Sequence, residues 1–192
     1  MRSSALSLVP TSSQRQQTRR QRYDEKRSTA QKCSASICTV NFGCEENLGY
    51  IIRAAACFGV ETVHVIGSIP DRKFLSALSG SLIDYVQIIQ HSNPHDFLEQ
   101  MRDQNVNLVA AELSETSVSI HDYEFTSKPT CLILGNEHTG VPGEILHHAD
   151  TVHIPMPGVG FCLNTAQTGN IMLFEYNRQL SIRSQREYLC AE

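Results

Sequence analysis

The segment Pro129–Gly135, which reads PTCLILG, is apolar at nearly every position between its proline and its glycine. Side chains of a β-strand point alternately to two faces, so a strand of this kind needs apolar cover on both faces. That environment is found in the middle of a parallel sheet, between two layers of helices. The segment therefore predicts a buried central strand.

The rest of the chain alternates short β-rich segments with stretches of helical periodicity. Strands are expected at 34–40, 62–67, 85–89, 106–113 and 151–155. Helices are expected at 47–58, 72–80, 93–103, 142–149 and 164–180. The predicted fold class is α/β, a mostly parallel sheet with helices on both faces.

Length and composition limit the class of protein. The 192 residues, 41% of them hydrophobic, suffice for one α/β domain and an extension. No apolar run approaches the roughly 18 residues of a membrane span, so no membrane partner is expected. Seven cysteines are scattered without a C-x-x-C pair, which predicts reduced thiols. The spacing of Cys33, Cys38 and Cys44 matches no usual zinc site, so no metal is expected.

Residues 1–32 differ in composition from the remainder, which is acidic. They hold eight of the sixteen Lys and Arg residues but only two of the twenty acidic residues, without a hydrophobic period. This pattern predicts a basic, disordered extension before a folded domain at 33–192. Three roles stay open for it: an arm that binds nucleic-acid phosphates, a transit peptide within residues 1–23, or an inert extension. The expected location is the cytoplasm, or an organelle if the transit peptide is real.

Three polar loops are not explained by the core. In the first, NFGCEENLGYIIRAA at 41–55, Asn47 is placed to cap the following helix. Arg53 follows inside that helix, between apolar neighbours. It is either a surface arginine whose stem covers the edge of the core, or a cation beside a substrate phosphate or oxyanion.

The second loop, in LILGNEHTGVP at 132–142, follows the buried strand directly. In open α/β sheets, ligands bind beyond the carboxyl ends of the strands, and glycines there let the backbone approach a ligand. A plain connecting loop leaves the charged Glu137 without an explanation. No Gly-Lys-Ser/Thr follows, which excludes a Walker phosphate loop.

The third loop lies in IPMPGVGFCLNTAQTGN at 154–170. Pro155 and Pro157 each fix φ and remove a backbone donor, while Gly158 and Gly160 leave backbone uncovered. Asn164 is well placed to cap the last helix. The loop is expected to form one wall of a pocket for a mostly apolar small molecule.

In this order, the three loops resemble the three motifs of the SpoU family of RNA ribose methyltransferases, within the SPOUT superfamily. The first motif is matched by Asn47, Gly49 and Arg53. The second is matched by Leu132, Leu134, Gly135, Glu137, Gly140 and Val141. The third is matched by Ile154, Pro155, Met156, Gly158, Leu163 and Asn164, whereas the family serine is Cys162 here. The resemblance covers residues 34–182.

The resemblance implies a C-terminal trefoil knot, which ordinary topology rules would not propose. It also implies S-adenosylmethionine as methyl donor. The residues it places around the donor are Leu134, Gly135, Glu137, Gly140, Ile154, Met156 and Leu163. The residues it places at the reaction centre are Asn47, Arg53, Glu137, Cys162 and Asn164.

The implied reaction is attack of a ribose 2′-OH on the donor methyl group. The family arginine, here Arg53, is assigned to activating the hydroxyl, but a guanidinium with a pKa above about 12 is a poor base. We expect Arg53 to grip the adjacent phosphate and to stabilise the developing alkoxide. Asn47, Glu137 and Asn164 would order the site around it, and the Cys162 thiol would be a weaker donor than serine.

The implied partners are RNA, with tRNA favoured over ribosomal RNA, and a second copy of the chain. On the last helix, a seam at spacings of three and four residues predicts close helix packing, either within the chain or in a homodimer. Its members are Ala166, Gly169, Leu173, Tyr176 and Leu180.

Two other functions compete. A non-catalytic, knotted RNA-binding dimer would not need Arg53, Glu137 and Asn164, although Cys162 leaves room for it. A nucleotide-binding oxidoreductase is disfavoured because no G-x-G-x-x-G follows the first strand.

Overall fold

The structure is a computed structural model that describes residues 17–190, with side chains described as far as residue 182. Contacts divide the chain into two compact units, with the division between Gln31 and Lys32. None of the helices in the described part of the chain combines the length and the apolar character that a membrane crossing requires.

The first unit contains one described helix, α2 (Arg19–Arg27), which buries none of its residues. Its N-terminus is closed by a capping box, in which Thr18 and Gln21 exchange side-chain and backbone hydrogen bonds. The structure thus describes a helix within the stretch 1–32, and disorder of this stretch stays a prediction. Residues 1–16, with most of the transit-peptide segment, lie outside the described residues.

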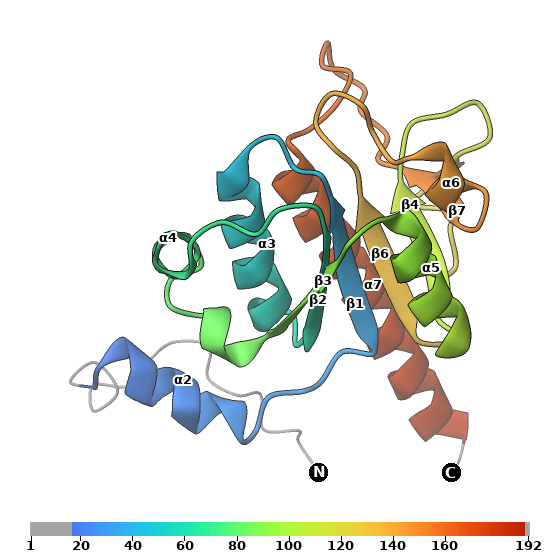
Figure 1. Cartoon of the computed structure of the whole chain (residues 1–192). Helices are drawn as coiled ribbons and strands as arrows, with labels where there is room; N and C mark the ends of the chain where they lie inside the picture. The colour runs from blue at the N-terminus through green and yellow to red at the C-terminus, as the bar shows by residue number, and fades with distance from the viewer. Residues whose placement is uncertain (1–16, 191–192) are drawn as a thin grey trace. The chain divides into compact units, whose positions relative to one another are not determined.

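The second unit is built on a seven-stranded sheet in which every pairing is parallel, as predicted. The strands are β1 (Ala35–Val40), β2 (Thr62–Ile66), β3 (Gln87–His91), β4 (Asn107–Ala111), β5 (Val118–Ser119), β6 (Thr130–Leu134) and β7 (Asp150–His153). Their order across the sheet is β3-β2-β1-β6-β4-β7-β5 (Figure 1). The buried segment that predicted a central strand is β6, between β1 and β4. The two-residue strand β5 was not predicted.

The helices of this unit are α3 (Glu45–Cys57), α4 (Arg72–Leu78), α5 (Pro94–Asp103), α6 (Gly143–Leu146) and α7 (Thr165–Cys190), with a short 3-10 turn at Ile83–Tyr85. Asn93 caps α5 by accepting a hydrogen bond from the Asp96 N–H, and Pro94 takes the first helical position. Gly59, with φ of +77°, ends α3 as predicted. The Val60 N–H then bonds to the Ala55 carbonyl oxygen across this turn.

Alternate side chains of the strands belong to two separate cores. One core joins strand residues such as Ile37 and Leu132 to α3 and α7. The other joins Cys38 and Ile133 to α5 and α6. In Figure 1, α5 lies in front of the strands and α7 behind them.

The predicted seam on α7 packs inside the chain. Leu173 and Tyr176 are fully buried in the first core, and Ala166 is nearly so. A Cβ added at Gly169 would lie 2.5 Å from Ile51 Cδ1 and 2.8 Å from Leu134 Cδ1. Of the two alternatives for the seam, the structure therefore shows packing within the chain.

The sheet order explains why loops far apart in sequence meet. Strands β1, β6, β4 and β7 are consecutive neighbours and run in the same direction. Their carboxyl ends therefore lie along one edge of the sheet. The first polar loop follows β1, the second follows β6 and the third follows β7, so all three emerge at this edge.

Candidate active site at the carboxyl edge of the sheet

Glu137, in the second loop, joins that loop to the first. Its carboxylate accepts hydrogen bonds from the backbone N–H groups of Gly43, at 2.7 Å, and Cys44, at 3.3 Å. It also accepts one from the side-chain amide of Asn47. Partial burial raises the pKa of this carboxyl, but the backbone and amide hydrogen bonds outweigh it and lower the pKa below its ordinary value. Glu137 is thus held as a carboxylate that orders two loops.

Asn47 does not cap α3, and that prediction is wrong. The helix begins two residues earlier than predicted, after Cys44, so that Asn47 lies in its first turn with its side chain 1% exposed. There its amide nitrogen donates to Glu137 and its amide oxygen accepts from Asn164 Nδ2, at 3.0 Å. Asn47 is therefore a buried link between the second and third loops.

Asn164 completes this link and caps α7, as predicted. Its side-chain oxygen accepts hydrogen bonds from the N–H groups of Ala166, at 2.9 Å, and Gln167, at 3.4 Å. The next residue, Thr165, donates from its hydroxyl to the Gly135 carbonyl oxygen at 3.3 Å. The start of the last helix is thereby tied to both other loops.

The second loop closes on itself through its two glycines. The N–H and C=O of Asn136 exchange hydrogen bonds with Gly140, at 3.1 and 3.0 Å. A Cβ on Gly135 would lie 2.3 Å from the Gly140 carbonyl carbon, and Gly140 has φ of +68°. Neither position accepts another residue without distortion. The two glycines therefore leave backbone uncovered by side chains at the carboxyl edge of the sheet.

A pocket of about 440 Å³, called the loop pocket below, lies between the second and third loops. All seven residues expected around the methyl donor line it: Leu134, Gly135, Glu137, Gly140, Ile154, Met156 and Leu163. Cys162 and Asn164 line it as well. The lining combines apolar side chains with exposed backbone of the glycine turn, which suits a small molecule that is mostly apolar with a few polar groups.

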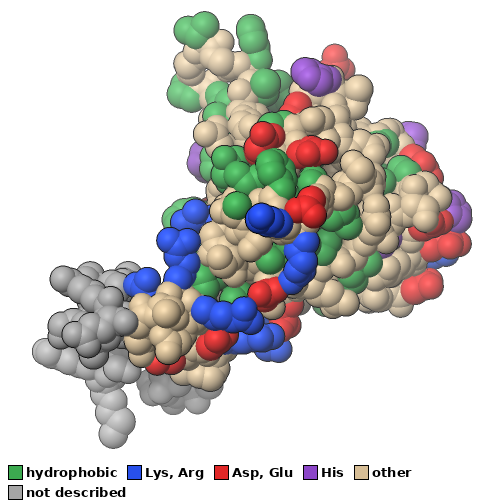
Figure 2. All heavy atoms as spheres, turned by 60° about the vertical axis from the view of Figure 1, so that its left-hand side comes forward, with side chains coloured by type: hydrophobic (Ala, Val, Ile, Leu, Met, Phe, Trp, Pro, Cys, Tyr) green, Lys and Arg blue, Asp and Glu red, His purple; other side chains and the backbone are tan. Residues whose placement is uncertain are grey.

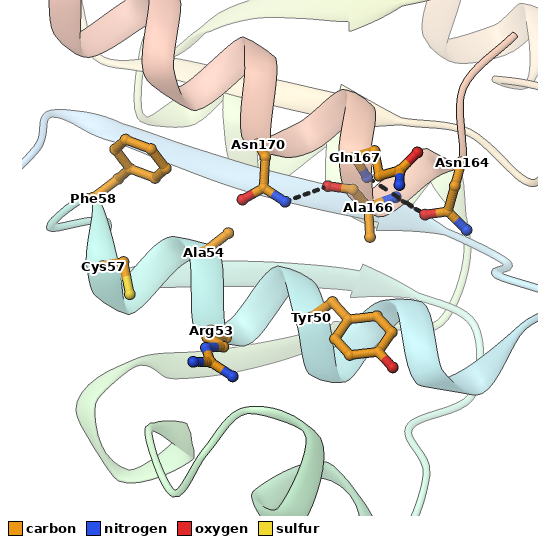
Figure 3. A pocket seen from close by; sticks show the side chains of 9 residues that line it. All are labelled: Tyr50, Arg53, Ala54, Cys57, Phe58, Asn164, Ala166, Gln167 and Asn170. Atoms are coloured by element: carbon orange, nitrogen blue, oxygen red, sulfur yellow. Dashed lines mark hydrogen bonds between the residues drawn. The ribbon is translucent and has the colours of Figure 1, made fainter.

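Arg53 lies in a different pocket, of about 530 Å³, formed by α3 and the start of α7 (Figure 3). Of the residues that the structure describes, Asn164 alone lines both pockets. The Arg53 side chain is exposed, and no other described residue gives it a hydrogen bond or an ion pair. The structure thus brings Asn47, Glu137 and Asn164 together but leaves Arg53 apart from the loop pocket of the same chain.

Glu112 is a site residue that the sequence analysis missed. Its carboxylate accepts a hydrogen bond from the Val141 N–H at 2.8 Å, and it lines the loop pocket. It was missed because the predicted strand 106–113 included it, whereas the observed strand β4 ends at Ala111 and leaves Glu112 in the following loop. A charged residue at the end of an apolar strand, the signal that singled out Glu137, was present here too.

Comparison with known proteins decides the family. A model of the family described as "SpoU rRNA Methylase family" matches residues 34–174. This chain belongs to the SpoU family. The three loops that suggested the family lie within the matched range, and the prediction drawn from them is confirmed.

Individual SpoU relatives support the assignment. The chain is 28% identical over 145 residues to a protein of Escherichia coli named tRNA (guanosine(18)-2'-O)-methyltransferase, covering 75% of this chain and 63% of the relative. The chain therefore spans less than two thirds of that relative's length.

Two solved structures match this fold. The A. aeolicus TrmH/SpoU tRNA modifying enzyme has a TM-score of 0.73 at 26% identity, covering 86% of this chain and 85% of the other. The AdoMet-bound rRNA methyltransferase from Sinorhizobium meliloti has a TM-score of 0.72 at 30% identity, covering 78% and 58%.

Proposed function

We propose that this protein transfers a methyl group from S-adenosylmethionine to the 2′-oxygen of a ribose in RNA. The observation that carries the proposal is the pocket between the second and third loops, which shares Asn164 with the pocket of Arg53. The names of the similar proteins agree with this reaction, since one is a tRNA 2′-O-methyltransferase and another is an rRNA methyltransferase with AdoMet bound.

The residues of the loop pocket fit such a donor. Leu134, Ile154, Met156 and Leu163 supply apolar surface for the adenosyl group. The turn formed by Gly135 and Gly140 supplies backbone that no side chain covers. The volume of about 440 Å³ lies within the range typical of small-molecule sites.

The chain's own residues have to align the acceptor and stabilise its charge. Bound S-adenosylmethionine supplies an electrophilic methyl group. Glu137 is occupied by three hydrogen bonds, so its role is to position Asn47 and the first loop. Arg53 lies in the pocket that shares Asn164, and among the described residues it has no ion pair. We assign it to the phosphate beside the acceptor ribose and to the developing alkoxide. The Cys162 thiol lines the same pocket and can donate only a weak hydrogen bond there.

We propose a homodimer in which Arg53 of one protomer faces the loop pocket of its partner. The separation of Arg53 from that pocket within one chain supports this arrangement. Exposed apolar side chains, Tyr50 on α3 and Phe174 on α7, offer surface for it on the same two helices. The seam through Gly169 is already buried and does not contribute.

Mixed protomers test the shared site. Arg53→Ala and Gly135→Ala protomers are each inactive in this scheme. A heterodimer of the two contains one site with an intact pocket and an intact Arg53, so activity should return on mixing. No recovery in a confirmed heterodimer would place Arg53 and the pocket of the same chain in one site.

A trefoil knot in the C-terminal segment is proposed as part of this fold. The late strands β6 and β7 both lie next to β4, between strands that precede them in sequence. This order is compatible with a chain end that has passed through an earlier loop. A traced experimental structure of the segment 129–182 tests it.

We favour tRNA over ribosomal RNA as the substrate. The E. coli relative is named for tRNA, whereas the S. meliloti structure is named for rRNA. The basic segment 1–32 is proposed to bind RNA phosphates. Removal of this segment should weaken RNA binding and make that binding less dependent on salt, while binding of the methyl donor should be unchanged. Location in the cytoplasm stays a prediction.

Incubation with methyl-labelled S-adenosylmethionine and separate pools of tRNA and ribosomal RNA tests the proposal. We expect label in the tRNA pool. Label in ribosomal RNA alone would change the substrate. RNA binding without label in either pool would instead support the non-catalytic RNA-binding dimer.

A further inference from the structure

The third loop carries apolar side chains that no described residue covers. Val159 is 95% exposed and Phe161 86% exposed. A Cβ added at Gly158 or Gly160 would meet no atom within 4 Å, so the loop stands clear of the rest of the chain. In Figure 1 the segment between β7 and α7 extends beyond the edge of the sheet, and Figure 2 shows hydrophobic side chains at the upper end of the molecule.

Phe161 lies at the rim of the loop pocket, which is the proposed site of the methyl donor. It lines this pocket together with its neighbours Cys162 and Leu163. An acceptor ribose has to enter the same mouth to reach the donor. The base on that ribose is attached one carbon away from the reacting 2′-OH, so it lies beside the rim when the hydroxyl is in place.

Within one chain, Phe161 has no cation beside it that could hold a phosphate. The described residues that line this pocket include Glu112 and Glu137 but no Lys or Arg. Their carboxylates would repel a phosphate, whereas a neutral base with a flat apolar face would not be repelled. In the proposed dimer, Arg53 of the partner subunit binds the phosphate beside the acceptor ribose, which leaves the base of that nucleotide for Phe161.

We propose that Phe161 stacks on the base of the acceptor nucleotide and holds it while the 2′-OH faces the donor pocket. This inference rests on the proposed function. Aromatic side chains stack on unpaired bases in RNA loops, and every base offers a π-face, so stacking does not select base identity. The substrate is therefore a nucleotide whose base is free of its helical neighbours, in a loop or bulge and not within a duplex.

The test compares Phe161→Ala with Phe161→Trp and two matched controls. Val159→Ala removes an exposed apolar side chain from the same loop, and Val118→Ala removes one that is 44% exposed on β5, outside the lining of that pocket. With unmodified tRNA transcripts, we expect Phe161→Ala to lower kcat/KM about tenfold to a hundredfold, mainly through KM. Phe161→Trp and both controls should stay within about threefold of wild type.

A transcript that lacks only the base at the methylated nucleotide separates stacking from other roles. The ribose and its 2′-OH remain, so wild type and Phe161→Ala should methylate it at the same reduced rate. Persistence of the full difference on this transcript would overturn the proposal. So would equal losses in Phe161→Ala and the two controls.

Two binding measurements identify other occupants of the loop. A weaker affinity of Phe161→Ala for S-adenosylhomocysteine would mean that Phe161 covers the donor instead. Dissociation of the dimer in sedimentation would mean that it contacts the partner. Either result would overturn base stacking. Failure of wild type to methylate any RNA would instead refute the proposed function, and this inference with it.

Discussion

The side-chain amide of Asn47 donates a hydrogen bond to the carboxylate of Glu137, ninety residues later in the chain. Because Asn164 in turn donates to the Asn47 oxygen, one buried asparagine connects loops that follow three different strands. The arrangement of the candidate site depends on this link more than on any one loop.

Asn47→Asp should reverse the way in which this site makes the unfolding free energy depend on pH. In wild type, Glu137 has a lowered pKa, so its contribution to stability is full above the ordinary carboxyl pKa and is lost as the pH falls through the lowered value. In the variant, two carboxylates face each other and the amide donor is gone. We expect unfolding in urea to cost about 2–3 kcal/mol less at pH 7, with partial recovery at pH 5 as one carboxyl takes a proton.

Gln167→Glu is the control for this change, because it adds a carboxylate at an exposed position of the same site. Its unfolding free energy should stay within about 0.5 kcal/mol of wild type at both pH values. A similar loss in the control would show that added charge, and not the Asn47 link, is responsible.

Gly135→Ala should disrupt the donor pocket, whereas Gly160→Ala should not. A Cβ at Gly135 meets backbone at 2.3 Å, and backbone cannot rotate away; a Cβ at Gly160 meets nothing within 4 Å. We expect the first variant to lose about 1–3 kcal/mol of unfolding free energy and its affinity for S-adenosylhomocysteine by calorimetry. Wild-type affinity in Gly135→Ala would contradict the role of this turn.

Acid should destabilise the protein through a buried histidine pair. His64 Nδ1 lies 2.9 Å from His91 Nε2, and both rings pack against Phe97 under α5. Burial, with a smaller effect from His91, lowers the pKa of His64 to about 4. Burial also lowers the pKa of His91, and the charge of Asp96 partly opposes this effect. The unfolded chain therefore binds more protons between about pH 6.5 and pH 4.

Over that interval we expect the unfolding free energy to fall by up to about 3 kcal/mol as the pH is lowered. Denaturant unfolding at several pH values measures it. His64→Gln should flatten this slope, while His147→Gln, at an exposed position, should retain it. An unchanged slope in His64→Gln would assign the acid sensitivity to other groups.

Arg53 variants should affect activity and leave stability alone. The side chain is exposed and makes no hydrogen bond with the described part of the chain, so Arg53→Ala should change the unfolding free energy by less than about 0.5 kcal/mol. Methyl transfer should be nearly abolished in Arg53→Ala and partly kept in Arg53→Lys. Equal, complete loss in both variants would show that the two-pronged guanidinium geometry matters and not the charge alone.

The sequence predicted the parts of this protein that follow from local patterns. The apolar run now seen as β6, the Asn93 cap and the Gly59 stop were all read correctly, because each depends on neighbouring residues. The three motif loops were recognised as well. Their meeting at one edge followed from the parallel sheet.

Long-range placement was harder to predict. Asn47 has the residue type of a cap, yet its partners lie 90 and 117 residues away, so no local pattern could place it inside the helix. The pocket of Arg53 depends on how α7 packs against α3, which periodicity does not specify. The helix α2 has no apolar face, so it left no periodic signal.

The most direct test of the central claim is the position of the transferred methyl group. After reaction of the wild-type protein with deuteromethyl S-adenosylmethionine and tRNA, nucleoside mass spectrometry should find the label on a ribose 2′-oxygen. Replacing that nucleotide by its 2′-deoxy form should abolish transfer. Label on a base, or undiminished label in the deoxy substrate, would contradict the assignment of this site to ribose methylation.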